Sequence, residues 1–216
     1  EDHYKPRFAG DSLPRHNVGL VVALADKLET LMGMFGIGNL PTGDRDPFAL
    51  RRHALGVIRM LIEKEMPLQL DALLACAVPA FGDKIEDASA QLADFIYDRL
   101  AGSLREQGYS AQEVDAVIAL RPQRLALVPR QLEAVRAFTQ LEEAPALAAA
   151  NKRVTNILKK AGEVDPHVNE ELLQEPAEKD LYAALQRFVP EANAQFDSGD
   201  YTASLQTLAV LRAPVD

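Results

Sequence analysis

The chain has 216 residues, 48% of them hydrophobic and 25% charged, with a net charge of −9. This size allows one large core or two smaller ones, and the negative charge argues against a protein that coats nucleic acid with its whole surface. No run approaches the roughly 18 apolar residues of a membrane-spanning helix, the first residues do not form a signal peptide, and the single cysteine, Cys76, excludes an internal disulfide and predicts a small buried side chain in a reducing cytoplasm.

Apolar residues recur at helical spacing along the chain, and runs of alternating β-branched residues are missing, which predicts an all-α protein. The first helix is predicted over residues 18–35, ended by the glycine-rich segment 36–43. The second helix is predicted to begin with Asp46 as N-cap and Pro47 in its first turn, where a missing N–H costs nothing.

The second helix is expected to have a core side and a basic side. Its apolar stripe consists of Leu50, Ala54, Val57, Ile58 and Leu61. Arg52 and Arg59 then lie on the opposite face.

Further helices are predicted between turn residues, over 70–81, 86–107, 110–120, 129–141 and 146–161. Ser110 and Glu113 form a capping box for the third of these. After residue 161 we expect short helices separated by Pro166, Pro176 and Pro190. A last helix is predicted over 201–211.

The sign of the charge reverses locally between residues 121 and 161, which hold 8 basic and 3 acidic residues. At 100° per residue, one face of helix 146–161 is apolar, and the other carries Lys152, Arg153, Asn156, Lys159 and Lys160. The simpler interpretation is a solvated face whose last-turn lysines complement the helix dipole. The alternative is an anionic partner that contacts these cations.

Two observations favour the anionic partner. Helix 146–161 has no acidic residue to pair with its cations, and Arg121, Arg124, Arg130 and Arg136 lie just upstream. Contacts to RNA phosphates from such a surface would be largely independent of sequence, so base reading would need side chains such as Asn151 or Asn156.

Asp26 lies within an apolar helix segment and is a candidate metal ligand. Because metal sites need several ligands and His3, His16 and His53 lack ligand-like spacing, we expect Asp26 to accept hydrogen bonds within the fold and to bind no metal. Segment 3–11 is interpreted as a surface loop that packs its aromatic residues. No phosphate-binding loop, nucleophile elbow or paired-cysteine metal motif is present.

Several runs resemble one known family, the beta subunits of bacterial heterotetrameric glycyl-tRNA synthetases. They are residues 3–11, 23–28, 35–38, 41–52, 119–122 and 149–158, of which Asp44 to Arg52 is the most specific. The lack of an initiator methionine and the extent of the resemblance lead us to expect a C-terminal fragment of such a subunit.

The resemblance implies a subunit of a glycine–tRNA ligase with no catalytic or metal-binding residues of its own. In that family two alpha and two beta subunits assemble in the cytoplasm, ATP and magnesium act at the alpha subunit, and the beta subunit binds tRNA(Gly). We therefore expect tRNA(Gly) and the alpha subunit as partners, no cofactor on this chain, and no membrane or DNA partner.

The resemblance also implies a division of the chain. Residues 1–66 would end a degenerate HD-like helical domain, 67–120 would be connecting helices, and 121–216 would form a truncated anticodon-binding-like helical module. Asp26 would then take the place of the last metal-binding aspartate of true HD phosphohydrolases. The alternative function is an HD-type metal phosphohydrolase relic with residual nucleotide binding. The candidate tRNA-binding residues are Arg52, Arg59, Arg121, Arg124, Arg130, Asn151, Lys152, Arg153, Asn156, Lys159 and Lys160.

Overall fold

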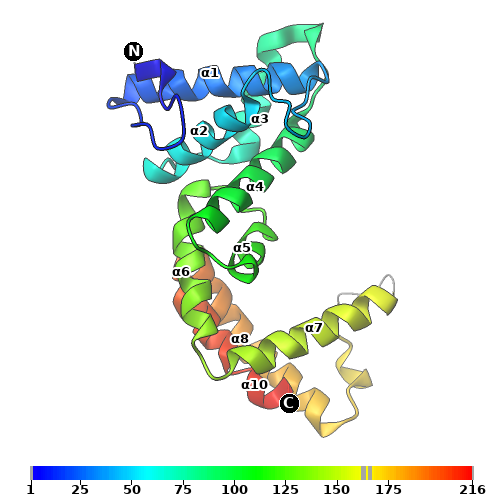
Figure 1. The fold of residues 1–216 in the computed structure, drawn as a ribbon. Helices are drawn as coiled ribbons and strands as arrows, with labels where there is room; N and C mark the ends of the chain where they lie inside the picture. The colour runs from blue at the N-terminus through cyan, green and yellow to red at the C-terminus, as the bar shows by residue number, and fades with distance from the viewer. Residues whose placement is uncertain (1, 162–163, 165–166, 216) are drawn as a thin grey trace. The chain divides into compact units, whose positions relative to one another are not determined.

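The computed structural model describes residues 2–161, 164 and 167–215 of the chain (Figure 1). Regular structure in these residues is helical, and their β contacts are limited to an isolated bridge between Thr42 and Arg45. The all-α prediction is therefore confirmed. The chain forms two compact units, residues 1–129 and residues 130–216, which are described separately below.

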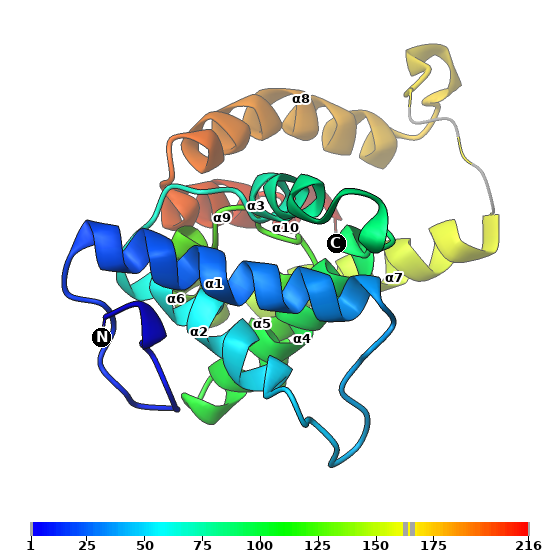
Figure 2. The same ribbon diagram turned by 90° about the horizontal axis from the view of Figure 1, so that it is seen from above.

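Unit 1 is built around its first helix, α1. Its α-helices are α1 (Asn17–Gly36), α2 (Leu50–Glu63), α3 (Leu70–Ala77), α4 (Ser89–Glu106) and α5 (Ala111–Ile118). Its 3-10 helices are η1 (Asp2–Tyr4), η2 (Val78–Lys84) and η3 (Leu125–Leu127). Helix α1 contacts α2, α3 and α4, and α5 packs on α4. Figures 1 and 2 both show α1 running alongside α2.

The core of unit 1 confirms the stripe predicted for α2 and includes one face of α4. On α2 the expected set of Leu50, Ala54, Val57, Ile58 and Leu61 is buried. On α4 the residues Leu92, Ile96, Leu100 and Leu104 are buried. Phe95 of α4 is half-buried and packs against Phe35 of α1, with 5.1 Å between ring centroids. Burial of this apolar area is the main force that holds the helices together.

The start of α2 differs from the prediction. The helix begins at Leu50, and its N-cap residue is Ala49, in the left-handed conformation with φ 54°. Asp46 still caps the helix, because its carboxylate accepts hydrogen bonds from the backbone N–H of Leu50 (2.7 Å) and of Arg51 (3.0 Å). The cap therefore reaches the helix across a turn, and Pro47 lies before the helix.

Helix α3 is shorter than predicted, and its cysteine is not buried as expected. It ends at Ala77, and the chain continues as the 3-10 helix η2, which has a proline in its first turn. Only Leu70 and Leu74 of α3 are buried, because they alone share its inward face. Cys76 does not share that face and is exposed, at a hollow that Leu24 and Leu28 of α1 also line, so the prediction of a buried cysteine is wrong.

The end of α1 comes very close to the segment that precedes α4. The backbone N–H of Glu86 donates to the carbonyl oxygen of Gly36 at 3.0 Å. A Cβ atom at Gly36 would lie 2.6 Å from Cβ of Ile85 and 2.8 Å from the carbonyl oxygen of Glu86. Glycine is required at this position for close approach between two backbones.

Unit 2 begins in the first turn of α6, with the boundary after Pro129. Its helices are α6 (Val128–Thr139), α7 (Ala144–Ala161), η4 (Glu170–Leu172), α8 (Pro176–Asp197), α9 (Tyr201–Ala209) and α10 (Arg212–Val215). Helix α9 packs on α8, and α10 contacts both α7 and α8. The Phe196 and Tyr201 rings meet edge to face, with 5.0 Å between their centroids.

Pro190 does not end a helix, contrary to the prediction. Helix α8 runs through it to Asp197. A proline inside a helix removes one hydrogen bond and crowds the preceding turn, but Ala192 and Phe196 beyond it are held in unit 2 by burial and by the contact with Tyr201. Pro166 lies outside the described residues.

Candidate nucleic-acid interface

The basic helix predicted from the sequence is α7, which starts two residues earlier than expected, at Ala144. Every residue from Asn151 to Ala161 is exposed. Lys152, Arg153, Lys159 and Lys160 follow one another around one side of the helix, within an arc of about 120° at 100° per residue. The prediction that the cations of α7 face solvent is confirmed.

The α7 cations have no counter-ions in the described part of the chain. Neither the ion pairs nor the hydrogen bonds among described residues involve Lys152, Arg153, Lys159 or Lys160. Lys159 and Lys160 lie in the last turn, where their charge complements the carboxyl end of the helix dipole. The dipole accounts for these two lysines, but it does not account for Lys152 and Arg153 in the middle of the helix.

A shallow hollow of about 380 Å³ lies along the basic side of α7. It is lined by Ala149, Lys152, Arg153, Asn156, Ile157 and Lys160. Asn156 therefore lies among the cations, where its amide can both donate and accept hydrogen bonds. Asn151 does not line the hollow, so the structure brings only one of the two predicted base-reading amides together with the charges.

The apolar side chains of α7 are also open to solvent, including Ile157 at the edge of the hollow. Val154, Ile157 and Leu158 keep 50%, 58% and 49% of their surface exposed. An amphipathic helix usually buries its apolar face. In the described residues this face of α7 is partly covered as far as Ala150 and uncovered from residue 151 on.

Arg121 has structural partners in unit 1. Its guanidinium donates to the carboxylate of Asp94 at 2.6 Å and lies over the ring of Tyr97, 4.7 Å from the ring centroid. The hydrogen bond to Asp94 raises the pKa of Arg121 above its usual value. Tyr97 in turn donates to the carbonyl oxygen of Pro122 at 3.2 Å. Arg121 therefore stabilises the turn after α5, although its guanidinium stays half exposed.

Arg124 and Arg130 are exposed, and no described acidic side chain pairs with either of them. Arg124 belongs to unit 1, whereas Arg130 belongs to unit 2 with α7. Arg136, which also lies upstream of α7, is exposed and has an interaction of its own. Within unit 2 the described cations without partners therefore include Arg130 on α6 and the four on α7.

Arg52 and Arg59 on α2 differ from one another. Arg59 donates to the carboxylate of Glu63 at 2.6 Å and to the carbonyl oxygen of Asp11 at 2.9 Å. Arg52 is exposed, and no described residue forms an ion pair or hydrogen bond with it. Of this pair, Arg52 alone has a guanidinium available to a ligand.

Asp26 does not behave as expected. Its carboxylate is exposed and accepts no hydrogen bond from a described residue, and only its backbone carbonyl accepts one, from the hydroxyl of Thr30 at 2.9 Å. The expected intramolecular role of this carboxylate is wrong, because Asp26 lies on the solvent side of α1 while its neighbours Lys27 and Leu28 are buried. Among the described residues, no group of three or more His, Cys, Asp or Glu side chains could hold a metal ion.

A helix that crosses a bilayer must be long and apolar, and this requirement can be applied to the described helices. None of them is both long enough and apolar enough to cross a membrane.

The chain is similar to proteins of known name. The family model for the glycyl-tRNA synthetase beta subunit matches residues 1–119. The glycine–tRNA ligase beta subunit of Acidovorax sp. (strain JS42) is 96% identical over all 216 residues of the chain. The corresponding subunits of Paracidovorax citrulli (strain AAC00-1) and Thiobacillus denitrificans (strain ATCC 25259 / T1) are 84% and 63% identical over the whole chain.

These similarities place the chain in one class of proteins, the subunits of aminoacyl-tRNA synthetases. The chain belongs to the glycyl-tRNA synthetase beta subunit family. It spans about 30% of the length of the curated relatives it matches. The matches do not confirm the expected C-terminal position of the chain within a beta subunit.

Proposed function

We propose that this chain is a tRNA-binding, non-catalytic part of a glycine–tRNA ligase beta subunit. In this proposal the alpha subunit binds glycine, ATP and magnesium, and the two kinds of subunit form an α2β2 enzyme in the cytoplasm that attaches glycine to tRNA(Gly). The family membership supports the assignment to the ligase. The exposed cations of α7, which have no counter-ion among the described residues, support the contact with RNA.

The physical basis is the release of counter-ions from RNA. When a lysine or arginine neutralises a phosphate, the cations condensed around that phosphate are freed, so affinity falls as salt rises. A lysine that is already paired with a carboxylate gains less from this exchange. No carboxylate of the described residues pairs with Lys152, Arg153, Lys159 or Lys160. The amide of Asn156 lies among these cations, where it can bond a base or a ribose.

The experiment replaces all four α7 cations with glutamine in the intact enzyme. The affinity for tRNA(Gly) is measured by filter binding or fluorescence anisotropy across a series of salt concentrations. Each lost phosphate contact should lower the slope of log affinity against log salt by about 0.7 to 0.9. The quadruple variant should therefore bind tRNA(Gly) more weakly and with a flatter salt dependence.

A matched control removes the same amount of charge elsewhere. Lys64, Lys84, Lys179 and Arg187 are exposed and lie outside α7. Replacing these four with glutamine should leave most of the affinity and the salt slope in place. If the α7 variant, with normal helicity and assembly, keeps wild-type affinity at every salt concentration, α7 is not a tRNA-binding surface.

The alternative of an HD-type phosphohydrolase relic depends on a cluster of metal ligands. The described residues hold no such cluster, and Asp26 lies on the exposed side of α1. No specific observation favours this second function.

A further inference from the structure

Two aromatic side chains near the start of the chain are exposed. Tyr4 keeps 63% of its surface accessible and Phe8 keeps 56%. The interpretation of segment 3–11 as a loop that packs its aromatic residues is therefore wrong. Large apolar rings are usually withdrawn from water, and exposed rings next to a cation are typical of surfaces that stack unpaired bases.

The exposure of Phe8 does not come from a loose chain end. The carboxylate of Asp11, which is buried, accepts hydrogen bonds from the backbone N–H and from Nε of Arg7, both at 2.9 Å, and from the backbone N–H of Ser12 at 2.9 Å. Arg59 of α2 donates to the carbonyl oxygen of Asp11 at 2.9 Å. The loop is closed on itself and attached to α2, so the Phe8 ring is presented to solvent by a fixed backbone.

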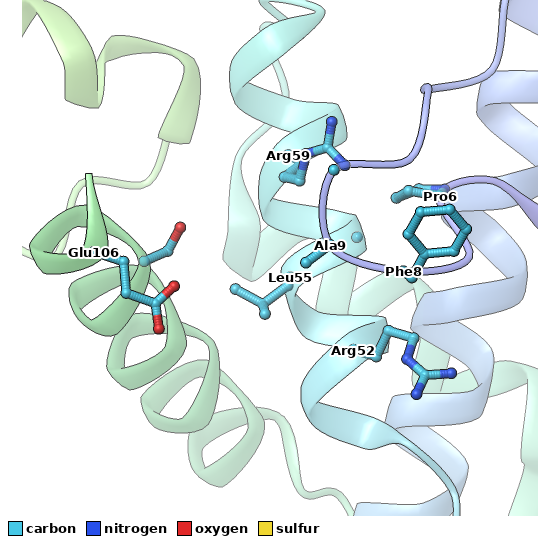
Figure 3. Close-up of a pocket in the computed structure, with 10 residues that line it drawn as sticks. Pro6, Phe8, Ala9, Arg52, Leu55, Arg59 and Glu106 are labelled. Atoms are coloured by element: carbon cyan, nitrogen blue, oxygen red, sulfur yellow. The ribbon is translucent and has the colours of Figure 1, made fainter.

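Two adjacent hollows lie on either side of Arg52 in unit 1. The first has a volume of about 350 Å³, and Phe8, Leu55 and Glu106 line it (Figure 3). The second has a volume of about 280 Å³, and its lining includes Tyr4 and Asp26. Arg52 lines both hollows, as does Pro6. Each hollow therefore contains one exposed aromatic ring and one carboxylate, and the two share an arginine.

The shared arginine is available to a ligand. No described side chain pairs with Arg52, and Figure 3 shows its guanidinium extending from α2 on the side of Phe8, away from Glu106 on α4. A guanidinium fork matches the oxygen atoms of a phosphate. The carboxylates of Asp26 and Glu106 would repel a phosphate, but they can accept hydrogen bonds from the exocyclic amino group of a base.

A second cation supports the charge at the Tyr4 hollow. Lys27 lines this hollow, and its stem is buried against α2, where a Cβ atom on Gly56 would lie 2.8 Å from Cε of Lys27. Burial lowers the pKa of Lys27, and the nearby charge of Asp26 acts in the opposite direction. His53 lines the same hollow, and its Nδ1 is buried without a partner among the described residues.

We propose that the two hollows bind two consecutive nucleotides of an unpaired RNA segment. One base stacks on Phe8, the next lies beside Tyr4, and the phosphate that links them is bound by Arg52. Glu106 and Asp26 accept hydrogen bonds from the amino groups of these bases, so the site favours cytosine over uracil, which has no amino group. This inference rests on the proposed function, because tRNA is the RNA that such an enzyme would bind.

The test uses the intact enzyme and two fluorescent single-stranded probes, hexacytidylate and hexauridylate, with anisotropy as the measurement. Stacking on one aromatic ring contributes a factor of about 5 or more to affinity. Phe8→Leu should therefore weaken hexacytidylate binding at least about fivefold, whereas Phe8→Tyr should keep it. Arg52→Gln should weaken it by a similar factor and lower its salt dependence. Glu106→Gln and Asp26→Asn should reduce the preference for hexacytidylate over hexauridylate.

Matched controls come from the loop before α2. Phe48 and Arg45 are exposed and line neither hollow, so Phe48→Leu and Arg45→Gln should leave hexacytidylate binding unchanged. The inference is overturned if Phe8→Leu and Arg52→Gln, with normal circular dichroism, both bind hexacytidylate as the wild type does. It is also overturned if the controls weaken binding to the same degree.

The outcomes separate this inference from the proposed function. The quadruple α7 variant should lose affinity for tRNA(Gly) but keep its affinity for hexacytidylate. If it keeps tRNA affinity while Phe8→Leu loses hexacytidylate affinity, α7 is excluded as an interface and the nucleotide site stands. If it loses tRNA affinity while Phe8→Leu has no effect on hexacytidylate, the α7 interface stands and the nucleotide site is refuted.

Discussion

Replacing Gly36 with alanine tests the close packing at the end of α1. The new Cβ atom would lie 2.6 Å from Cβ of Ile85, 2.8 Å from the carbonyl oxygen of Glu86 and 2.9 Å from Cδ1 of Ile85. The carbonyl oxygen of Glu86 is a backbone atom, and Cβ of Ile85 is bonded directly to the backbone. Rotation of a side chain therefore moves neither of them away. The segment around Ile85 must shift by about 1 Å, which also strains the hydrogen bond from Glu86 to Gly36.

The size of the effect follows from two opposing terms. Overpacking of this kind costs about 1 to 3 kcal/mol. Alanine is a better helix former than glycine, which stabilises the helix by up to about 1 kcal/mol. Because the first term exceeds the second when backbone has to move, Gly36→Ala should destabilise unit 1 by about 1 to 2 kcal/mol.

Gly102 provides the matched control. It lies inside α4, and a Cβ atom there would meet no atom within 4 Å. Gly102→Ala should therefore stabilise α4 by about 0.5 to 1 kcal/mol through helix propensity alone. The two variants make the same chemical change and should shift stability in opposite directions.

Native-state amide exchange in the intact beta subunit measures this difference, since it reports the local opening free energy of α1 and α4 separately. Slower exchange in Gly102→Ala and faster exchange in Gly36→Ala is the expected pattern. If Gly36→Ala protects α1 as much as Gly102→Ala protects α4, the close contact with Ile85 and Glu86 does not limit this position and the reasoning fails.

Two further predictions concern unit 1. Ser110→Ala removes the hydroxyl oxygen that accepts a hydrogen bond from the backbone N–H of Glu113 at 3.2 Å. The change should destabilise α5 by about 1 kcal/mol, and unchanged amide exchange in α5 would contradict this. Burial, followed by the charge of Lys27, lowers the pKa of His53 in the folded state. As pH falls below the ordinary histidine pKa, His53 binds a proton in the unfolded chain before it does so in the folded chain. The free energy of unfolding therefore decreases. His53→Gln should flatten the decline in urea midpoint between about pH 7 and pH 5, and an equal decline in the variant would refute the assignment.

The parts of the fold that follow from local spacing could be predicted from the sequence. The capping box of α5 needs only Ser110 and Glu113 three residues apart, and both of its hydrogen bonds are present. The buried stripe of α2 follows from helical periodicity, because only one face of a surface helix can meet the core. Helix ends were less predictable. Asp46 caps α2 across a turn that depends on the left-handed conformation of Ala49, and sequence spacing gives no sign of that conformation.

The parts that depend on tertiary contacts could not be predicted. Cys76 lies in an apolar run, but the core needs only one narrow face of the short helix α3, so the cysteine is exposed. Arg52 and Arg59 are equivalent in sequence pattern. In the structure Arg59 bonds Glu63 and the loop at Asp11, whereas Arg52 has no partner among the described residues. The exposure of Phe8 depends on the same loop, and the aromatic and basic composition of segment 3–11 was the only sequence signal for it.

The cations of α7 belong to a chain whose net charge is −9. A polyanion that approaches such a chain is repelled by the acidic majority of its charges and attracted by one helix, so it is turned toward that helix before contact. This orientation acts on the rate of association, and it weakens as the Debye length falls to about 10 Å at 0.1 M salt. The acidic residues of the chain therefore narrow the directions from which a productive encounter with α7 can begin, and this holds also for those that form no contact in the complex.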